Sequence, residues 1–147
     1  MKNTSTRGRA RRGLTLIEVL LVLAILVIIA SVAIVAIGPR MEEAKRGKAK
    51  VLIGEFETAL EAYRINIGSF PTTSQGLDAL QNAPTDLPNP AKWAGPYLKK
   101  GVPADPWGQS FQYASPGSNN ADAPDIWSLG ADGQDGTADD VTNWSEE

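Results

Sequence analysis

Residues 14 to 37 read LTLIEVLLVLAILVIIASVAIVAI, an apolar run in which Glu18 is the one charged residue. As an α-helix this run would be about 36 Å long, enough to cross the hydrocarbon core of a bilayer. A helix that is apolar on every side must be covered by lipid or by other helices, and a domain of this size is too small to bury it. The sequence therefore predicts a transmembrane helix over residues 14–38 rather than a buried core helix.

A basic leader precedes the apolar run. The first thirteen residues hold five Lys or Arg residues and neither Asp nor Glu. A secretory signal peptide places its small-residue cleavage site after the apolar stretch, and this stretch is too long for such a segment. Cleavage before the apolar run would instead remove the leader and keep the helix. Residues 1–13 are therefore interpreted as a cleaved leader and not as part of the fold.

The composition excludes several classes of function. The leader takes five of the fourteen basic residues and none of the seventeen acidic ones, so the rest of the chain is strongly acidic. An acidic surface argues against nucleic acid as a partner, because phosphate binding needs a basic footprint. The chain has neither Cys nor His, which excludes disulfides, zinc sites of the usual kind and a Ser-His-Asp triad. Cations that prefer oxygen ligands remain possible.

A second helical segment follows Gly38-Pro39 and runs over residues 39–67. Pro39 removes one backbone donor and crowds the preceding turn, which predicts a kink or a short melted stretch there. Beyond it, apolar residues recur at steps of three and four and predict a helix that packs on a globular domain. Gly68 is a typical stop signal. The apolar positions are Leu52, Phe56, Ala59, Leu60, Tyr63 and Ile67.

Residues 68–147 form a loop-rich region that contains most of the prolines and glycines. Its patterns predict a short helix over 75–81 and strands over 110–114 and 125–129. Together they indicate an α+β domain in which a small antiparallel sheet packs on the 39–67 helix. The four tryptophans are interpreted as anchors of the core and its rim rather than as a ligand cage.

The acidic loop, residues 125–140, reads DIWSLGADGQDGTADD and is the one stretch that suggests chemistry. It holds five acids interleaved with three glycines. Calcium takes six to eight oxygen ligands and tolerates irregular geometry, although the spacing here is not that of an EF-hand. From these residues alone, a calcium site and a solvated acidic loop are equally good interpretations. Asp139 and Asp140 could be considered as the carboxylate pair of a glycosidase, but adjacent residues on a short loop rarely flank a substrate. No enzyme activity is therefore predicted.

The junction Gly13-Leu14-Thr15-Leu16-Ile17-Glu18 resembles the processing site of the type IV pilin-like family. The resemblance implies that a prepilin peptidase cleaves between Gly13 and Leu14 and methylates the new terminus at Leu14. It also implies that Glu18 pairs with the α-amine of Leu14 on a neighbouring subunit during assembly. The alternative for Glu18 is a residue near the helix N-terminus that reaches the headgroups.

Three further stretches resemble the major pseudopilins of type II secretion systems. They are Gly68-Ser69-Phe70-Pro71-Thr72-Thr73 with Gln75-Gly76-Leu77 and Ala79-Leu80, then Gly95-Pro96-Tyr97-Leu98, then Asp105-Pro106-Trp107-Gly108 with Tyr113. The resemblance implies a type IV pilin-like fold whose long N-terminal helix packs on a small antiparallel sheet and whose C-terminal loop binds calcium.

As a function, the resemblance implies a structural subunit that polymerises into the pseudopilus and so promotes export of folded proteins across the outer membrane. The implied partners are further copies of the chain, minor pseudopilins, the prepilin peptidase and the inner-membrane assembly platform. The implied location is the bacterial inner membrane, crossed once, with residues 68–147 in the periplasm. A different pilin-like filament subunit and a membrane-anchored calcium-binding module that never polymerises are the alternatives.

For the acidic loop, the resemblance implies five calcium ligands. The side chains of Asp132, Asp139 and Asp140 and the backbone carbonyls of Leu129 and Gln134 would supply them. Asp135 would either contribute or face solvent. Without the ion the three carboxylates would repel one another, so calcium is expected to order the loop and stabilise the domain by mass action.

Overall fold

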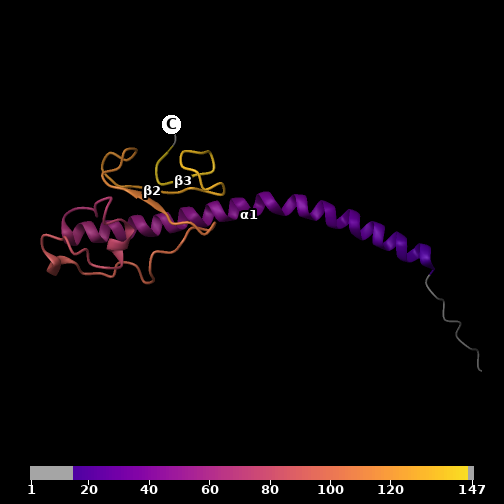
Figure 1. The fold of residues 1–147 in the computed structure, drawn as a ribbon, viewed down its shortest axis with the longest axis horizontal. Coiled ribbons are helices and arrows are strands. Elements are labelled where there is room, and N and C mark those ends of the chain that lie inside the picture. Colours follow the sequence, from indigo (N-terminus) through magenta and orange to yellow (C-terminus); the bar gives the residue numbers. More distant parts are fainter. Residues whose placement is uncertain (1–14, 146–147) are drawn as a thin grey trace, which may run out of the picture. The chain divides into compact units, whose positions relative to one another are not determined.

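The computed structural model describes residues 15–145, with the backbone alone for residues 32–37. The chain divides into two compact units, Met1–Arg40 and Met41–Glu147. One long helix, α1 (Leu16–Ile67), contributes to both, and the other helices and strands belong to the second unit (Figure 1). The structure does not describe the predicted leader, residues 1–13. Both residues of the predicted cleavage site, Gly13 and Leu14, therefore lie outside the described residues.

Helix α1 continues without interruption past Pro39. The short melted stretch predicted at Gly38-Pro39 is therefore not present in the described backbone. A proline removes a single N–H donor, and the neighbouring turns keep their own hydrogen bonds, so the helix tolerates it here. The predicted end is confirmed: Gly68 has φ of +102° and its N–H donates to the Arg64 carbonyl at 2.7 Å.

The apolar stripe of α1 forms the core of the second unit, as predicted. Phe56, Leu60 and Tyr63 are each 1% exposed. The Phe56 ring meets Phe111 edge-on, with centroids 5.0 Å apart. Rings in this orientation add to the stability that their buried area already gives. Residues from the loop-rich region thus complete a core that the helix alone could not enclose.

Three short strands form an antiparallel sheet in the order β1-β2-β3. They are β1 (Gln112–Ala114), β2 (Asp125–Ser128) and β3 (Val141–Thr142). Ile126 and Val141 belong to the same buried cluster as the α1 stripe, and Figure 1 shows β2 and β3 alongside this part of the helix. The predicted strands are confirmed with slightly shorter ranges. β3 was not predicted, because two residues are too few to show an alternating pattern.

Two short 3-10 helices follow α1 in the chain and precede the strands: η1 (Leu77–Leu80) and η2 (Pro90–Lys92). The predicted helix over 75–81 is thus a single 3-10 turn that buries Leu77 and Leu80. Trp93 anchors this region, since its indole Nε1 donates to the Ala79 carbonyl at 3.0 Å. Such a half-buried indole that bonds to a carbonyl agrees with the predicted anchoring role.

Asp125, the first residue of β2, organises the loop before it. Its side chain is 2% exposed. Its carboxylate accepts the backbone N–H groups of Ser118, Asn119 and Asn120 at 2.7, 2.9 and 3.0 Å, and both asparagine side chains donate to it as well. Burial alone would raise the pKa of Asp125, but these hydrogen bonds outweigh burial and lower the pKa from 3.8.

Replacing this carboxylate should therefore destabilise the domain in a pH-dependent way. In Asp125→Asn an amide NH₂ group replaces one carboxylate oxygen and faces backbone N–H donors that then lose their acceptor. We therefore expect a loss of about 1–3 kcal/mol in the free energy of unfolding at neutral pH. Because the folded-state pKa is lowered, the charged form contributes fully above pH 3.8 and its contribution is lost as the pH falls below that value. Urea unfolding at a series of pH values measures this difference.

Asp122→Asn is the matched control, since Asp122 is exposed in the same loop. The control should unfold like the parent chain. An Asp125→Asn variant as stable as the parent at neutral pH would contradict the organising role of Asp125.

Candidate functional site

The helix of the first unit has an exposed apolar surface from Leu16 to Ile29. From Leu16 to Ile29 every large apolar side chain is between 44% and 78% exposed. An apolar surface of this extent marks a site of contact with a membrane or with other protein. Where side chains are described, no helix has the length and hydropathy that a membrane span needs. Residues 32–37 of the predicted span 14–38 are outside that set.

Glu18 takes part in a capping box at the start of α1. Its carboxylate Oε2 accepts the backbone N–H of Thr15 at 2.9 Å and the Thr15 hydroxyl at 3.1 Å. In return, Thr15 Oγ1 accepts the Glu18 N–H at 3.3 Å. Sequence reasoning missed this pair, although the spacing Thr-x-x-Glu before an apolar run is its signature. The pairing of Glu18 with a neighbouring Leu14 stays a prediction, because Leu14 lies outside the described residues.

In the acidic loop, four of the five predicted ligand oxygens gather around one hydroxyl. Thr137 Oγ1 lies 2.6 Å from Asp139 Oδ1, 3.3 Å from Asp132 Oδ1, 3.3 Å from the Gln134 carbonyl and 3.5 Å from Asp140 Oδ1. A hydroxyl has a single proton and can donate to only one of these acceptors at a time. The loop thus points three carboxylate oxygens and one carbonyl oxygen at a single hydroxyl.

These oxygen atoms are chemically suited to bind calcium. Carboxylate and carbonyl oxygens are the ligands that calcium prefers, and water can complete the shell of six to eight. In the part of the chain that the structure describes, acidic side chains form no group of three or more already in a metal-binding arrangement. In this conformation the carboxylates accept hydrogen bonds within the loop.

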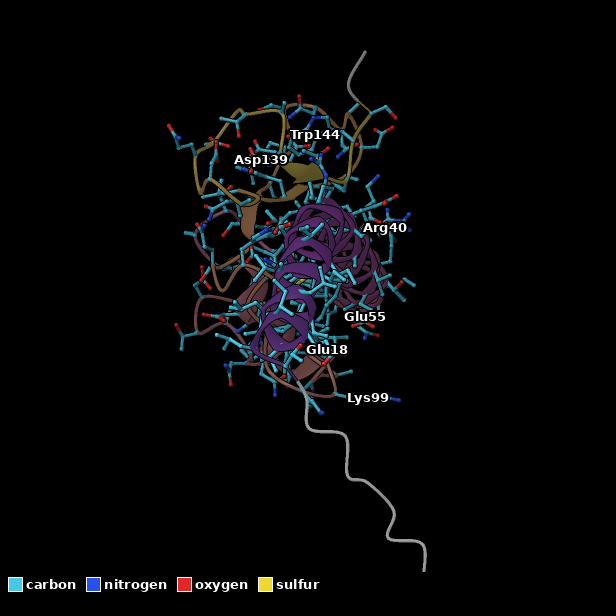
Figure 2. All side chains as sticks on the ribbon, turned by 90° about the vertical axis from the view of Figure 1, so that its right-hand side faces the viewer. Glu18, Arg40, Glu55, Lys99, Asp139 and Trp144 are labelled. Atoms are coloured by element: carbon cyan, nitrogen blue, oxygen red, sulfur yellow. The ribbon has the colours of Figure 1, made fainter. Side chains whose placement is uncertain are left out.

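Each of the three acids accepts a backbone N–H within the loop. Figure 2 labels one of them, Asp139. Asp139 Oδ2 accepts the N–H groups of Ala131 and Asp132 at 2.6 and 2.9 Å. Asp132 Oδ1 accepts the N–H of Gln134, and Asp140 Oδ2 that of Gly136, both at 2.8 Å. The Thr137 hydroxyl and then the Asp132 N–H lower the pKa of Asp139 to about 2. Asp139 is therefore ionised at any physiological pH.

The two remaining candidates differ from this group. Of the oxygens around Thr137 in the described loop, none belongs to Leu129. The Gly130 N–H of the same peptide donates to Ser128 Oγ at 3.2 Å, and since the N–H and C=O of a trans peptide point in opposite directions, the Leu129 carbonyl points away from Ser128 Oγ. Asp135 is held elsewhere, since its Oδ1 accepts the Trp127 indole N–H at 2.8 Å.

Gly130 lets the two ends of the loop approach each other. Its φ of +65° favours glycine, and a Cβ there would lie 2.6 Å from Asp139 Oδ2 and closer still to the Asp139 carbonyl. Gly136 has a similar φ of +80° but open space around it. The close contact at Gly130 therefore positions Asp139, whereas Gly136 only permits a turn.

Arg46 connects the loop to α1. Its Nη2 donates to the carbonyls of Ala138 and Asp140 at 3.2 and 3.3 Å. More than ninety residues separate the partners in the chain. No local pattern could have identified Arg46, because a cation on a helix is ordinarily a solvated surface residue.

Comparison with known families gives two matches along the chain. The model for "Type II secretion system (T2SS), protein G" matches residues 36–144. The model for the "Prokaryotic N-terminal methylation motif" matches residues 8–37. The second match covers the predicted cleavage site and the start of α1, and the first covers the acidic loop.

Individual relatives agree with these matches over nearly their full lengths. The chain is 43% identical to type II secretion system core protein G of Aeromonas hydrophila, over 93% of this chain and 94% of the relative. It is 41% identical to the protein of the same name in Pseudomonas aeruginosa, over 92% and 96%. Among solved structures, the major pseudopilin from the type 2 secretion system of enterohaemorrhagic Escherichia coli matches with a TM-score of 0.63. That match has 36% identity and covers 72% of this chain and 91% of the other.

The close approach at Gly130 gives a testable prediction. In both Gly130→Ala and Gly136→Ala the left-handed backbone costs about 1–2 kcal/mol. Gly130→Ala should lose about 1–3 kcal/mol more, because its Cβ collides with Asp139. Thermal unfolding of the two variants measures the difference. Equal losses would mean that the contact between Gly130 and Asp139 does not constrain the loop.

Proposed function

The chain belongs to the type II secretion system protein G family, and we propose that it polymerises into a periplasmic pseudopilus that promotes export of folded proteins across the outer membrane. The observation that carries this proposal is the agreement with major pseudopilins over both the N-terminal helix and the globular unit. Its role is that of a structural subunit.

Processing and location follow from the N-terminal region. We propose that a prepilin peptidase cleaves between Gly13 and Leu14 and methylates Leu14, which the methylation motif over residues 8–37 supports. The exposed apolar helix holds the subunit in the inner membrane before assembly, with the globular unit in the periplasm. Minor pseudopilins and an inner-membrane assembly platform are the further partners that we propose.

The exposed apolar surface of α1 must also be covered in the assembled filament. Once subunits leave the bilayer, apolar side chains such as Leu20 and Ile28, which are 54% and 63% exposed, can be covered by the helices of other copies. Head-to-tail contacts between identical subunits that do not close into a ring give an open helical filament. Glu18 would set the register, because burying its charge without a cationic partner is costly.

We further propose that the acidic loop binds one calcium ion. The side chains of Asp132, Asp139 and Asp140 and the carbonyls of Leu129 and Gln134 would hold it. The convergence of four of these oxygens on the Thr137 hydroxyl supports this set. Calcium would supply positive charge where the acids repel one another, so its role is structural: it holds the last part of the chain in place.

The proposed register role of Glu18 can be separated from its capping role. Glu18→Ala removes both the charge and the cap, while Glu18→Gln keeps an acceptor for Thr15 and removes only the charge. We expect both variants to insert into the membrane normally and to form few filaments. Electron microscopy of filaments, with membrane fractionation as the insertion control, measures both effects. Normal filaments from Glu18→Gln would refute charge pairing and leave capping as the role of Glu18.

The calcium proposal predicts a stability change that depends on the ion. Calcium at a hundred times its Kd should stabilise the parent chain by about 2.7 kcal/mol. Asp132→Ala should lose most of this gain and should unfold near the parent Tm in chelator. Thermal unfolding with calcium and with chelator tests this, with Asp122→Ala as the control for loss of an exposed acid. If Asp132→Ala lowers the Tm equally in both conditions, the calcium site is wrong.

A further inference from the structure

We infer that Arg46 is a positioning residue for the calcium loop, holding the Asp139-Asp140 segment in the conformation that ligates the ion. This inference rests on the calcium site proposed above. It adds a residue from a distant part of the chain that neither the acidic pattern of the loop nor its spacing indicates.

The first argument is the geometry of the contact. The two carbonyls that Arg46 binds belong to Ala138 and Asp140, the residues on either side of Asp139. One guanidinium therefore holds the peptide group before Asp139 and the peptide group after Asp140. The Asp139 side chain is at the same time directed to Thr137 and to the Ala131 N–H. Arg46 thus restricts the backbone that carries two of the three carboxylates, without using either carboxylate itself.

The second argument is that Arg46 extends from a firmly held part of α1. Ala49, one turn further on, is 0% exposed. Glu42, one turn earlier, accepts the Trp107 indole N–H at 2.9 Å and pairs with Lys45 at 3.0 Å. A ligand is positioned accurately when its support belongs to a rigid element. Arg46 thus connects the loop to a packed part of the helix.

Two effects of Arg46 on calcium affinity have opposite signs, and this makes the inference testable. Positioning of the loop strengthens binding, so its loss should weaken affinity. The positive charge repels a cation, so its loss should strengthen affinity. Lysine keeps the charge, but its strongly hydrated ammonium on a flexible chain holds the two carbonyls less rigidly than Nη2 of the planar guanidinium does. Arg46→Lys therefore separates the two effects.

The experiment is a calcium titration of the full-length chain in detergent by isothermal calorimetry. We expect Arg46→Ala to raise the Kd about tenfold, the lower end of the range for residues that orient metal ligands. Arg46→Lys should show most of the same increase. Arg64→Ala is the matched control, because Arg64 lies on the same helix and pairs with the exposed Glu61. Its Kd should equal that of the parent chain.

Two results would overturn the role of Arg46 while leaving the calcium site intact. One is a parent chain that binds calcium and an Arg46→Ala variant with the same Kd. The other is tighter binding by Arg46→Ala together with parent-like binding by Arg46→Lys, which would make Arg46 only a source of repulsion. A parent chain that does not bind calcium would instead refute the calcium proposal itself, and the role of Arg46 with it. If circular dichroism shows that Arg46→Ala is unfolded, the test rests on Arg46→Lys alone. A calcium Kd of Arg46→Lys equal to that of the parent chain would then refute the positioning role.

Discussion

An apolar helix that cannot be buried by its own domain is the constraint on which the rest of this protein depends. The side chains from Leu16 to Ile29 are exposed, and the free energy gained by covering them is available only through lipid or through other subunits. The same helix continues into the second unit, where its stripe around Phe56 and Tyr63 forms the core. One element thus serves both assembly and folding.

The second unit has few regular elements, and polar side chains hold in place much of the chain that a larger sheet would otherwise organise. Asp125 gathers the N–H groups of one loop, and Asp139 does the same for the acidic loop. Buried Asp105 accepts the Ser128 hydroxyl and so joins a third loop to β2. Because each carboxylate satisfies several donors at once, short strands suffice to hold long irregular segments.

The sequence predicted the features that depend on periodicity or on local turn chemistry. The α1 stripe, the end at Gly68 and the strands β1 and β2 belong to this class. It did not predict β3, which is too short, or the unbroken helix at Pro39. The acids of the loop could be recognised by composition, but the central place of Thr137 and the contact of Arg46 depend on tertiary structure. Such contacts between distant residues leave no local pattern.

Trp127 gives the acidic loop a built-in optical reporter. Its indole N–H donates to Asp135, which lies between the proposed ligands Gln134 and Asp139, and its ring meets Trp144 edge-on at 5.8 Å. Any rearrangement of the loop that moves Asp135 changes the polarity around this fluorophore. Such a rearrangement would therefore change the contribution of Trp127 to the emission of the unlabelled protein, which holds three other tryptophans.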